Sequence, residues 1–377
     1  MCGRRLVMAV VLTLATTVTT APPAVAARPG EPFYGDVNDD GHRDRLTVYT
    51  GAAGNRGCFV SVAYGRPGGG YLPPVGHRYI ETNAIRPHIC PDMGTVADLR
   101  GDGRPELLLA FSDNNNASGY QDVLVLDQNF RLAYDRQIGG GFHWFVGTAD
   151  FNGDGKEDVY VEGIECAGFA RLISDGTGGF RPDEFRWAGD VSSIVDDLDG
   201  NGTSEAVITW SFPNHCGSSS DAGTGVLVLH GDGRIQHLER WMTEDEWYVR
   251  WSISKVRANN DRFYDVRTEH DNGRVDYHLG AADGTFVRAP KLTGDQVYLS
   301  KSQPVVVNVT ANDWITSTAP ITIREYPRHG RVMITTDRKV RYTPNPGQRQ
   351  TDRFAYQVTE TNGVTAATAV HIRWRGM

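Results

Sequence analysis

A nine-residue segment rich in aspartate recurs five times along the chain. Its copies begin at residues 36, 98, 150, 197 and 257, at intervals of 47 to 62 residues. Most copies carry aspartate, asparagine or glutamate at positions 1, 3, 5 and 9, and four of the five carry glycine at position 6. A repeat of this length is typical of a chain assembled from similar supersecondary units. The fold must therefore accommodate about five related units.

The spacing of these side chains matches the needs of a calcium ion. Calcium prefers six to eight oxygen ligands at about 2.3–2.6 Å, and a glycine at position 6 permits the positive φ of a tight wrap. Position 7 offers a backbone carbonyl, here from His42, Arg104, Lys156 and Thr203. The expected calcium ligands are Asp36, Asn38, Asp40, His42 and Asp44 in loop one, Asp98, Asp102, Arg104 and Glu106 in loop two, Asp150, Asn152, Asp154, Lys156 and Asp158 in loop three, and Asp197, Asp199, Asn201, Thr203 and Glu205 in loop four.

An EF-hand shares the beginning of this pattern, but it requires a glutamate at position 12 and flanking helices. Position 12 is Thr47, Leu109, Val161 and Ile208 in the first four copies, and each lies in an apolar run of β-strand character. We therefore reject an EF-hand. Three or four strands per repeat predict an all-β fold, namely a calcium-loop β-propeller of about five blades over residues 31–292. Because the chain enters close to the first loop, we expect a strand from the far end of this region to complete the first blade.

These loops resemble the FG-GAP/VCBS repeats of integrin-type propellers and of many secreted bacterial proteins. The resemblance rests on the DxNxDGxxD loops and on the turn at Leu279–Phe286. It implies a propeller with calcium in its loops and a role in adhesion, glycan binding or scaffolding. Loops one, three and four match the repeats well. Arg100 replaces the third ligand of loop two, and the fifth copy lacks the first acid and the glycine, so we expect no ion in loop five.

The last part of the chain, residues 293–377, has a different character. Six or seven short strands in about 75 residues predict a β-sandwich. The segment resembles bacterial cadherin-like or Ig-like modules in its Asn308–Asp313 start and in Asp352–Tyr356, which implies a spacer or adhesion domain without catalysis. It carries eleven basic and six acidic residues, a net charge of +5. Such a charge could favour anionic wall polymers, but a solvated basic face is the simpler interpretation.

Residues 1–26 read as a signal peptide, with Arg4 and Arg5 before the apolar run Leu6–Leu14 and small residues at Ala24–Ala26. The run is too short for a membrane span. We therefore expect a secreted, extracellular protein without a membrane span. Four cysteines then remain, and among the three possible disulfide pairings we favour Cys58–Cys90 and Cys166–Cys216, because each pair lies in neighbouring repeats.

Charge and composition favour a binding protein. Without the signal peptide the net charge is −10, which makes duplex nucleic acid a poor partner. We expect a non-catalytic module that binds an extracellular glycan or protein, with Tyr248 and Arg250 as candidate ligand-binding residues beside a tryptophan pair assigned to the core. The alternative is a carbohydrate-active enzyme, a glycoside hydrolase or polysaccharide lyase, on the same scaffold. No catalytic residue can be assigned, since nothing in the sequence ties His88, His143, His215 and Glu165 together.

Overall fold

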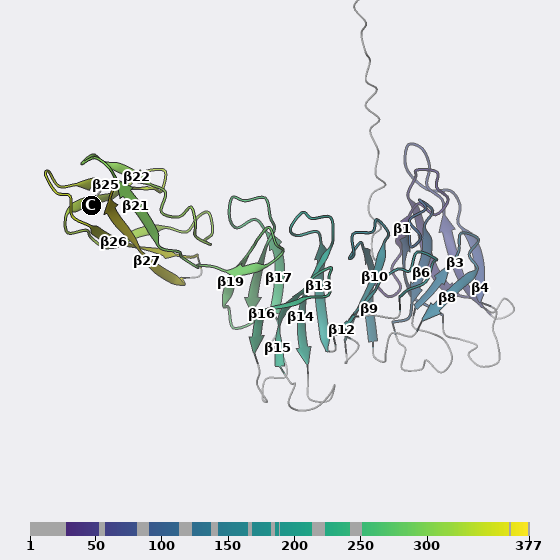
Figure 1. Ribbon diagram of the computed structural model, residues 1–377. Helices are drawn as coiled ribbons and strands as arrows, with labels where there is room; N and C mark the ends of the chain where they lie inside the picture. Colours follow the sequence, from purple (N-terminus) through teal and green to yellow (C-terminus); the bar gives the residue numbers. More distant parts are fainter. Residues whose placement is uncertain are drawn as a thin grey trace, which may run out of the picture.

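The computed structural model describes residues 28–52, 57–80, 90–112, 123–136, 142–164, 168–181, 185–187, 189–212, 223–241, 251–361 and 363–375. This part of the chain is all-β and contains no helix (Figure 1). The first twenty strands form five four-stranded antiparallel sheets, and within each sheet the strands lie in sequence order. The expected all-β fold is therefore confirmed for the described residues.

The five sheets follow one another along the chain. The first sheet contains β1 (Phe33–Gly35), β2 (Asp44–Thr50), β3 (Cys58–Ala63) and β4 (Val75–Ile80). The second contains β5 (Met93–Ala97), β6 (Glu106–Ala110), β7 (Val123–Leu126) and β8 (Leu132–Arg136). The third contains β9 (Phe142–Ala149), β10 (Asp158–Ile164), β11 (Phe169–Leu172) and β12 (Phe185–Trp187). The fourth contains β13 (Asp190–Asp196), β14 (Glu205–Phe212), β15 (Gly223–Leu229) and β16 (Ile235–Trp241). The fifth contains β17 (Trp251–Val256), β18 (Asp265–His270), β19 (Val275–Gly280) and β20 (Phe286–Arg288).

Each sheet packs against the next through its own apolar core. Because side chains alternate between the two faces of a strand, a central strand contributes to two cores at once. In β6, Leu107 and Leu109 pack toward the first sheet, whereas Leu108 packs toward the third. In β14, Ile208 faces the third sheet and Val207 faces the fifth. This double burial explains why the strands that follow the loops are continuous apolar runs.

The propeller prediction concerned a ring of sheets and the strand that completes the first of them. In the described residues no apolar core joins the first sheet to the fifth, and no sheet closes into a barrel, so a closed ring is not shown. The expectation that a distant strand completes the first sheet is wrong. The chain supplies β1 itself just before loop one, where Phe33 pairs with Leu46 and is fully buried. On the face of this sheet that is turned away from the second sheet, the side chain of Tyr49 is 43% exposed.

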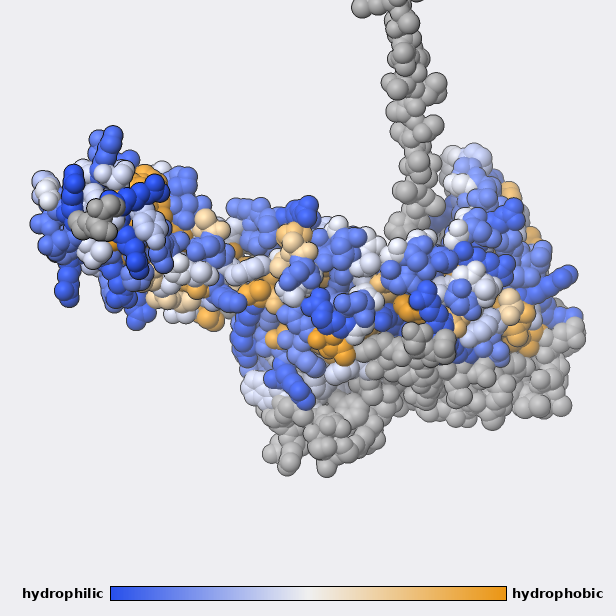
Figure 2. Space-filling model, in the orientation of Figure 1, coloured by the Kyte–Doolittle hydropathy of each residue, from blue (hydrophilic) through white to orange (hydrophobic). Residues whose placement is uncertain are grey.

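The C-terminal part is a two-sheet β-sandwich, as predicted. One sheet has the order β21-β27-β26-β23 and the other β22-β25-β24. Their bounds are β21 (Asp295–Leu299), β22 (Val305–Val307), β23 (Ile321–Glu325), β24 (Gly330–Ile334), β25 (Val340–Pro344), β26 (Asp352–Thr359) and β27 (Thr365–Trp374). Tyr342, Phe354 and Tyr356 fill the core between the two sheets. Figure 2 shows a largely hydrophilic visible face on this domain.

One of the two favoured disulfides lies within the described residues. Cys58 at the start of β3 is bonded to Cys90, three residues before β5, with a Cα–Cα distance of 5.4 Å. The predicted Cys58–Cys90 bridge between neighbouring units is therefore confirmed. Cys166 and Cys216 lie outside the described residues, as do Tyr248, Arg250 and the predicted signal peptide.

Candidate metal-binding loops

The five aspartate-rich loops occupy equivalent places in their sheets. Each joins the first strand to the second, and its ninth residue begins that second strand, as Asp44 does in β2 and Glu205 does in β14. The prediction that the loops lead into strands is thus confirmed. The loops lie on the upper side of the sheets in Figure 1.

Backbone hydrogen bonds connect successive loops. The residue at position 8 of loops three, four and five donates its N–H to a carbonyl at the start of the preceding loop. Glu157 donates to Asp98 at 3.1 Å, Ser204 to Asp150 at 2.8 Å, and Tyr264 to Leu198 at 2.9 Å. Loops two to five therefore form a continuous hydrogen-bonded row along one side of the molecule.

The first aspartate of each of loops one to four caps its own loop. In loop two the carboxylate of Asp98 accepts hydrogen bonds from the N–H groups of Gly101 at 2.8 Å and Gly103 at 2.9 Å. Asp197 does the same for Gly200 and Gly202 in loop four. The glycine at position 6 has a φ of 80° in loop two and 90° in loop four, a left-handed conformation that favours glycine. The wrapped shape expected from the sequence is therefore present.

The acidic residue at position 9 is buried in all five loops: Asp44, Glu106, Asp158, Glu205 and Asp265 are each at most 2% exposed. One carboxylate oxygen accepts the N–H of the residue at position 2, as Asp158 does from Phe151 at 3.0 Å. Where the residue is aspartate, the other oxygen accepts an N–H from near the end of the third strand: from Gly65, Ser174 and Gly280, at 2.7 to 3.0 Å. These aspartates thus tie the loop to the sheet.

Burial raises the pKa of all five of these carboxyl groups, to about 6 for Asp158 and about 7 for Glu205. In Glu205 the charges of Asp199 and Asp197 raise the pKa further. Loop five keeps the same clamp through Asp265, although it lacks the first acid. The acidic residue at position 9 therefore has a structural role even where the other expected calcium ligands of the loop are missing.

Loops two and five, which match the repeat least well, each have an arginine in place of an expected ligand. In loop two, Nε of Arg100 lies 3.2 Å from Oε1 of the buried Glu106. In loop five, Arg257 at position 1 donates to the carbonyl oxygen of Arg262 at 2.7 Å. A guanidinium thus supplies positive charge in both loops, which supports the expectation that loop five holds no ion and weakens loop two as a site.

Loop four gathers three carboxylates most closely. Ligand oxygens of Asp197, Asp199 and Glu205 all lie within 4.8 Å of one another, and among the described residues no other group of three or more acidic, histidine or cysteine side chains does so. The extra methylene of Glu205, compared with the aspartates at position 9 of loops one and three, leaves its second oxygen uncommitted to the third strand. Carboxylates at this spacing repel one another unless a cation or a proton lies between them.

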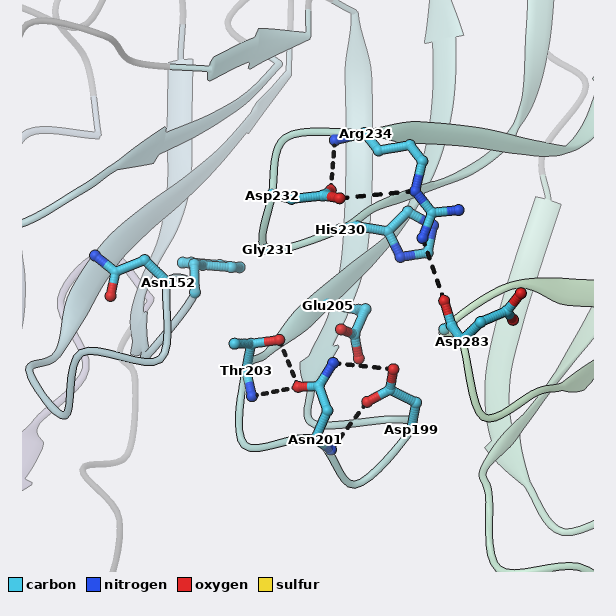
Figure 3. Close-up of a pocket in the computed structure, with 12 residues that line it drawn as sticks. Asn152, Asp199, Asn201, Thr203, Glu205, His230, Gly231, Asp232, Arg234 and Asp283 are labelled. Atoms are coloured by element: carbon cyan, nitrogen blue, oxygen red, sulfur yellow. Dashed lines mark hydrogen bonds and ion pairs between the residues drawn. The ribbon is translucent and has the colours of Figure 1, made fainter.

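A pocket of about 410 Å³ opens beside loop four (Figure 3). Asp199, Asn201 and Glu205 line one side of it, and the turns after β15 and β19 line the other. Its lining from those turns comprises His230, Gly231, Asp232, Arg234, Asp283 and Gly284. Phe151 and Asn152 of loop three also line it, so the pocket lies between loops and turns of the third, fourth and fifth sheets.

Charged groups of the pocket point toward one another. Arg234 donates to the carbonyl oxygen of Asp283 at 3.4 Å, and its Nε lies 3.9 Å from the carboxylate of Asp232. His230 is 4% exposed and Nε2 of its ring has no hydrogen-bond partner among the described residues. Burial lowers the pKa of His230, and Arg234 lowers it further. Sequence reasoning missed His230, Asp232 and Arg234 because they come from a turn at least 25 residues after loop four that carries no part of the nine-residue pattern.

Comparison with known families identifies the C-terminal domain. Residues 288–373 match the model of a bacterial Ig domain, in agreement with the two-sheet sandwich. No FG-GAP or VCBS repeat model matches, and no curated protein matches the chain. Within the described part of the chain, no helix has the length and apolar character needed to cross a membrane. The described part of the chain is thus all-β, and residues 288–373 form a bacterial Ig-like domain.

Proposed function

We propose that loops one, three and four bind calcium and that the five sheets are the blades of a propeller-type binding module of the FG-GAP/VCBS kind. The observation that carries this proposal is the clustering of Asp197, Asp199 and Glu205 within 4.8 Å in a loop of the predicted shape. Three acidic groups so close together, one of them buried, favour occupation by a hard dication. Loops one and three share the same glycine-containing wrap.

The proposed ion would have both a structural and a recognition role. Carboxylate and amide oxygens of Asp199 and Asn201 would hold it, and the adjoining pocket would leave room for an external ligand. Because extracellular calcium modules of this kind bind at about 10⁻⁴ to 10⁻³ M, the module would work outside the cell. The Cys58–Cys90 disulfide supports an oxidising compartment. We propose that the module binds a glycan or protein there without catalysing a reaction.

Calcium binding is tested by counting the bound ions. Equilibrium dialysis at millimolar calcium should give about three ions per chain, with affinities in the range of extracellular modules. The Asp199→Ala variant should bind one ion fewer. Asn259→Ala is the matched control, because Asn259 holds the same position 3 in loop five, where its side-chain oxygen accepts the N–H of Asp261. An unchanged ion count in Asp199→Ala would contradict the assignment of loop four.

The binding role needs a separate measurement. The purified chain should be applied to a glycan array and to immobilised extracellular proteins, with calcium and with a chelator. We expect ligand binding that weakens on chelation, and no shortening of polysaccharide chains in a parallel depolymerisation assay. Cleavage of a glycosidic bond by the purified chain would replace the binding role with an enzymatic one.

A further inference from the structure

A second pocket lies in the Ig-like domain, far along the chain from the loops. It encloses about 610 Å³ where one end of β23 meets the start of β26 and the end of β27. The pairing of Arg353 with His371 across β26 and β27 brings two of its basic residues side by side. The full lining is Glu325, Tyr326, Arg328, His329, Thr351, Asp352, Arg353, His371, Ile372 and Arg373.

A buried aspartate holds this pocket in shape. Asp352 is 8% exposed, and its carboxylate accepts the backbone N–H groups of Arg328 and His329, both at 2.9 Å, and the hydroxyl of Tyr342 at 2.9 Å. These bonds fix the backbone from which the side chain of Arg328 projects. The carboxylate is turned toward the backbone and the core, and five of the ten lining residues are arginine or histidine.

The arginines of the pocket are largely free to meet a ligand. Arg353 lies 3.4 Å from the exposed Glu325. Arg328 and Arg373 form no ion pair with any of the described residues, and both are exposed. Guanidinium groups bind carboxylates through paired hydrogen bonds, with geometry that a solvated lysine does not offer. The pocket therefore suits an anionic group.

The aromatic side chain of Tyr326 lines the same pocket as these arginines. Tyr326 is 71% exposed, more than any other large hydrophobic side chain in the described part of the chain. An exposed aromatic side chain at a polar pocket is a common feature of binding sites, because its ring offers an apolar face and its hydroxyl a polar group. A flat apolar face next to guanidinium groups matches a pyranose ring that carries a carboxylate.

We propose that this pocket binds an acidic polysaccharide whose sugar rings carry carboxylate groups. Tyr326 contacts the face of a sugar ring, and Arg328 and Arg373 bind its carboxylates. The domain's net charge of +5 places these contacts on the one basic region of an otherwise acidic chain, so a polyanion is attracted here and repelled elsewhere. This site does not depend on calcium in the loops.

The test measures binding of oligogalacturonate to the full chain by isothermal titration calorimetry. A chelator is present throughout, which removes any bridge between the glycan and the loops. Oligomers of glycerol phosphate and a neutral maltooligosaccharide serve as comparison ligands. We expect oligogalacturonate to bind most tightly, and the double variant Arg328→Ala/Arg373→Ala and the single variant Tyr326→Ala each to weaken it by about tenfold or more.

The matched control is Arg331→Ala/Arg341→Ala. Both residues are exposed arginines on β24 and β25 of the other sheet, so this variant removes the same charge from the same domain. It should change the affinity by no more than about twofold. An equal loss in the two double variants would reduce the effect to general charge attraction and overturn the site. Tighter binding of glycerol phosphate oligomers or of the neutral glycan would overturn the assigned ligand class.

Discussion

The carboxylate of Asp265 accepts the N–H of Ala258 at 2.6 Å and that of Gly280 at 3.0 Å. It does so in loop five, where Arg257 replaces the first acid of the repeat. The same clamp recurs at Asp44 and Asp158 in loops that we propose to bind calcium. The position-9 residue thus anchors the loop to the sheet independently of any ion.

The first prediction concerns this anchor. Asp265→Asn should lower the free energy of unfolding by about 1–3 kcal/mol, because an amide NH₂ would face a backbone N–H that loses its acceptor. The loss should be the same with calcium and with chelator, and urea denaturation measures it. Asp261→Asn, at an exposed position of the same loop, is the control and should change stability by less than about 0.5 kcal/mol. A calcium-dependent effect of Asp265→Asn would show that loop five binds an ion after all.

A second prediction concerns the arginine in loop two. Arg100→Asn restores the third ligand of the repeat and frees Glu106 from its ion pair. The variant should bind about one more calcium ion than the parent chain. With chelator it should unfold more readily, because the buried carboxyl group of Glu106 loses its cation. Arg104→Asn, which leaves the position-7 carbonyl in place, should leave the ion count unchanged in equilibrium dialysis.

The third prediction concerns pH. Glu162 in β10 is 4% exposed and accepts hydrogen bonds from the N–H and hydroxyl of Ser193. Burial raises its pKa to about 7, against the lowering effect of Ser193 and of the charge of Arg28. Since the folded state holds this proton more tightly than the unfolded chain does, its stabilising contribution is complete below about pH 4.5 and is lost as the pH rises through about 7.

The variant Glu162→Gln tests whether Glu162 makes the fold less stable as the pH rises. The amide stays neutral and its oxygen still accepts from Ser193, so the variant should lose less stability than the parent between pH 5 and pH 8. The difference is on the order of 3 kcal/mol at most, since each pKa unit corresponds to about 1.4 kcal/mol. Urea midpoints at the two pH values measure it, with the exposed Glu31→Gln as control. Glu205 and Asp158 shift stability in the same direction, so only the comparison between variants isolates Glu162.

The fourth prediction concerns the disulfide. Cys58 and Cys90 are separated by 32 residues, and closing a loop of that length stabilises the fold by roughly 3–4 kcal/mol in the chain-entropy model. The double variant Cys58→Ser/Cys90→Ser should therefore melt at a lower temperature. Reducing agent should lower the melting temperature of the parent chain but should leave this variant less affected. Equal sensitivity of the two proteins to reduction would assign the effect to other cysteines.

The sequence was most informative where the determinants are local. Loop shape depends on residues within nine positions, so Asp98 and Gly103 could be read directly from their spacing. The role of Asp44 and Asp158 could not be read in this way, because their partners Gly65 and Ser174 lie 21 and 16 residues away. The pocket around His230 and Arg234 could not be predicted for a similar reason, because it depends on how neighbouring sheets pack against each other. The short strand β1 was missed because three residues carry almost no periodicity.

The hydrogen bonds from Glu157 to Asp98, from Ser204 to Asp150 and from Tyr264 to Leu198 have a mechanical consequence. A chain pulled by its two ends cannot lengthen between the second and fifth sheets until these links break. Because the links lie in series, each would bear the tension applied through the Ig-like domain, and the sheets would separate one after another as single links break.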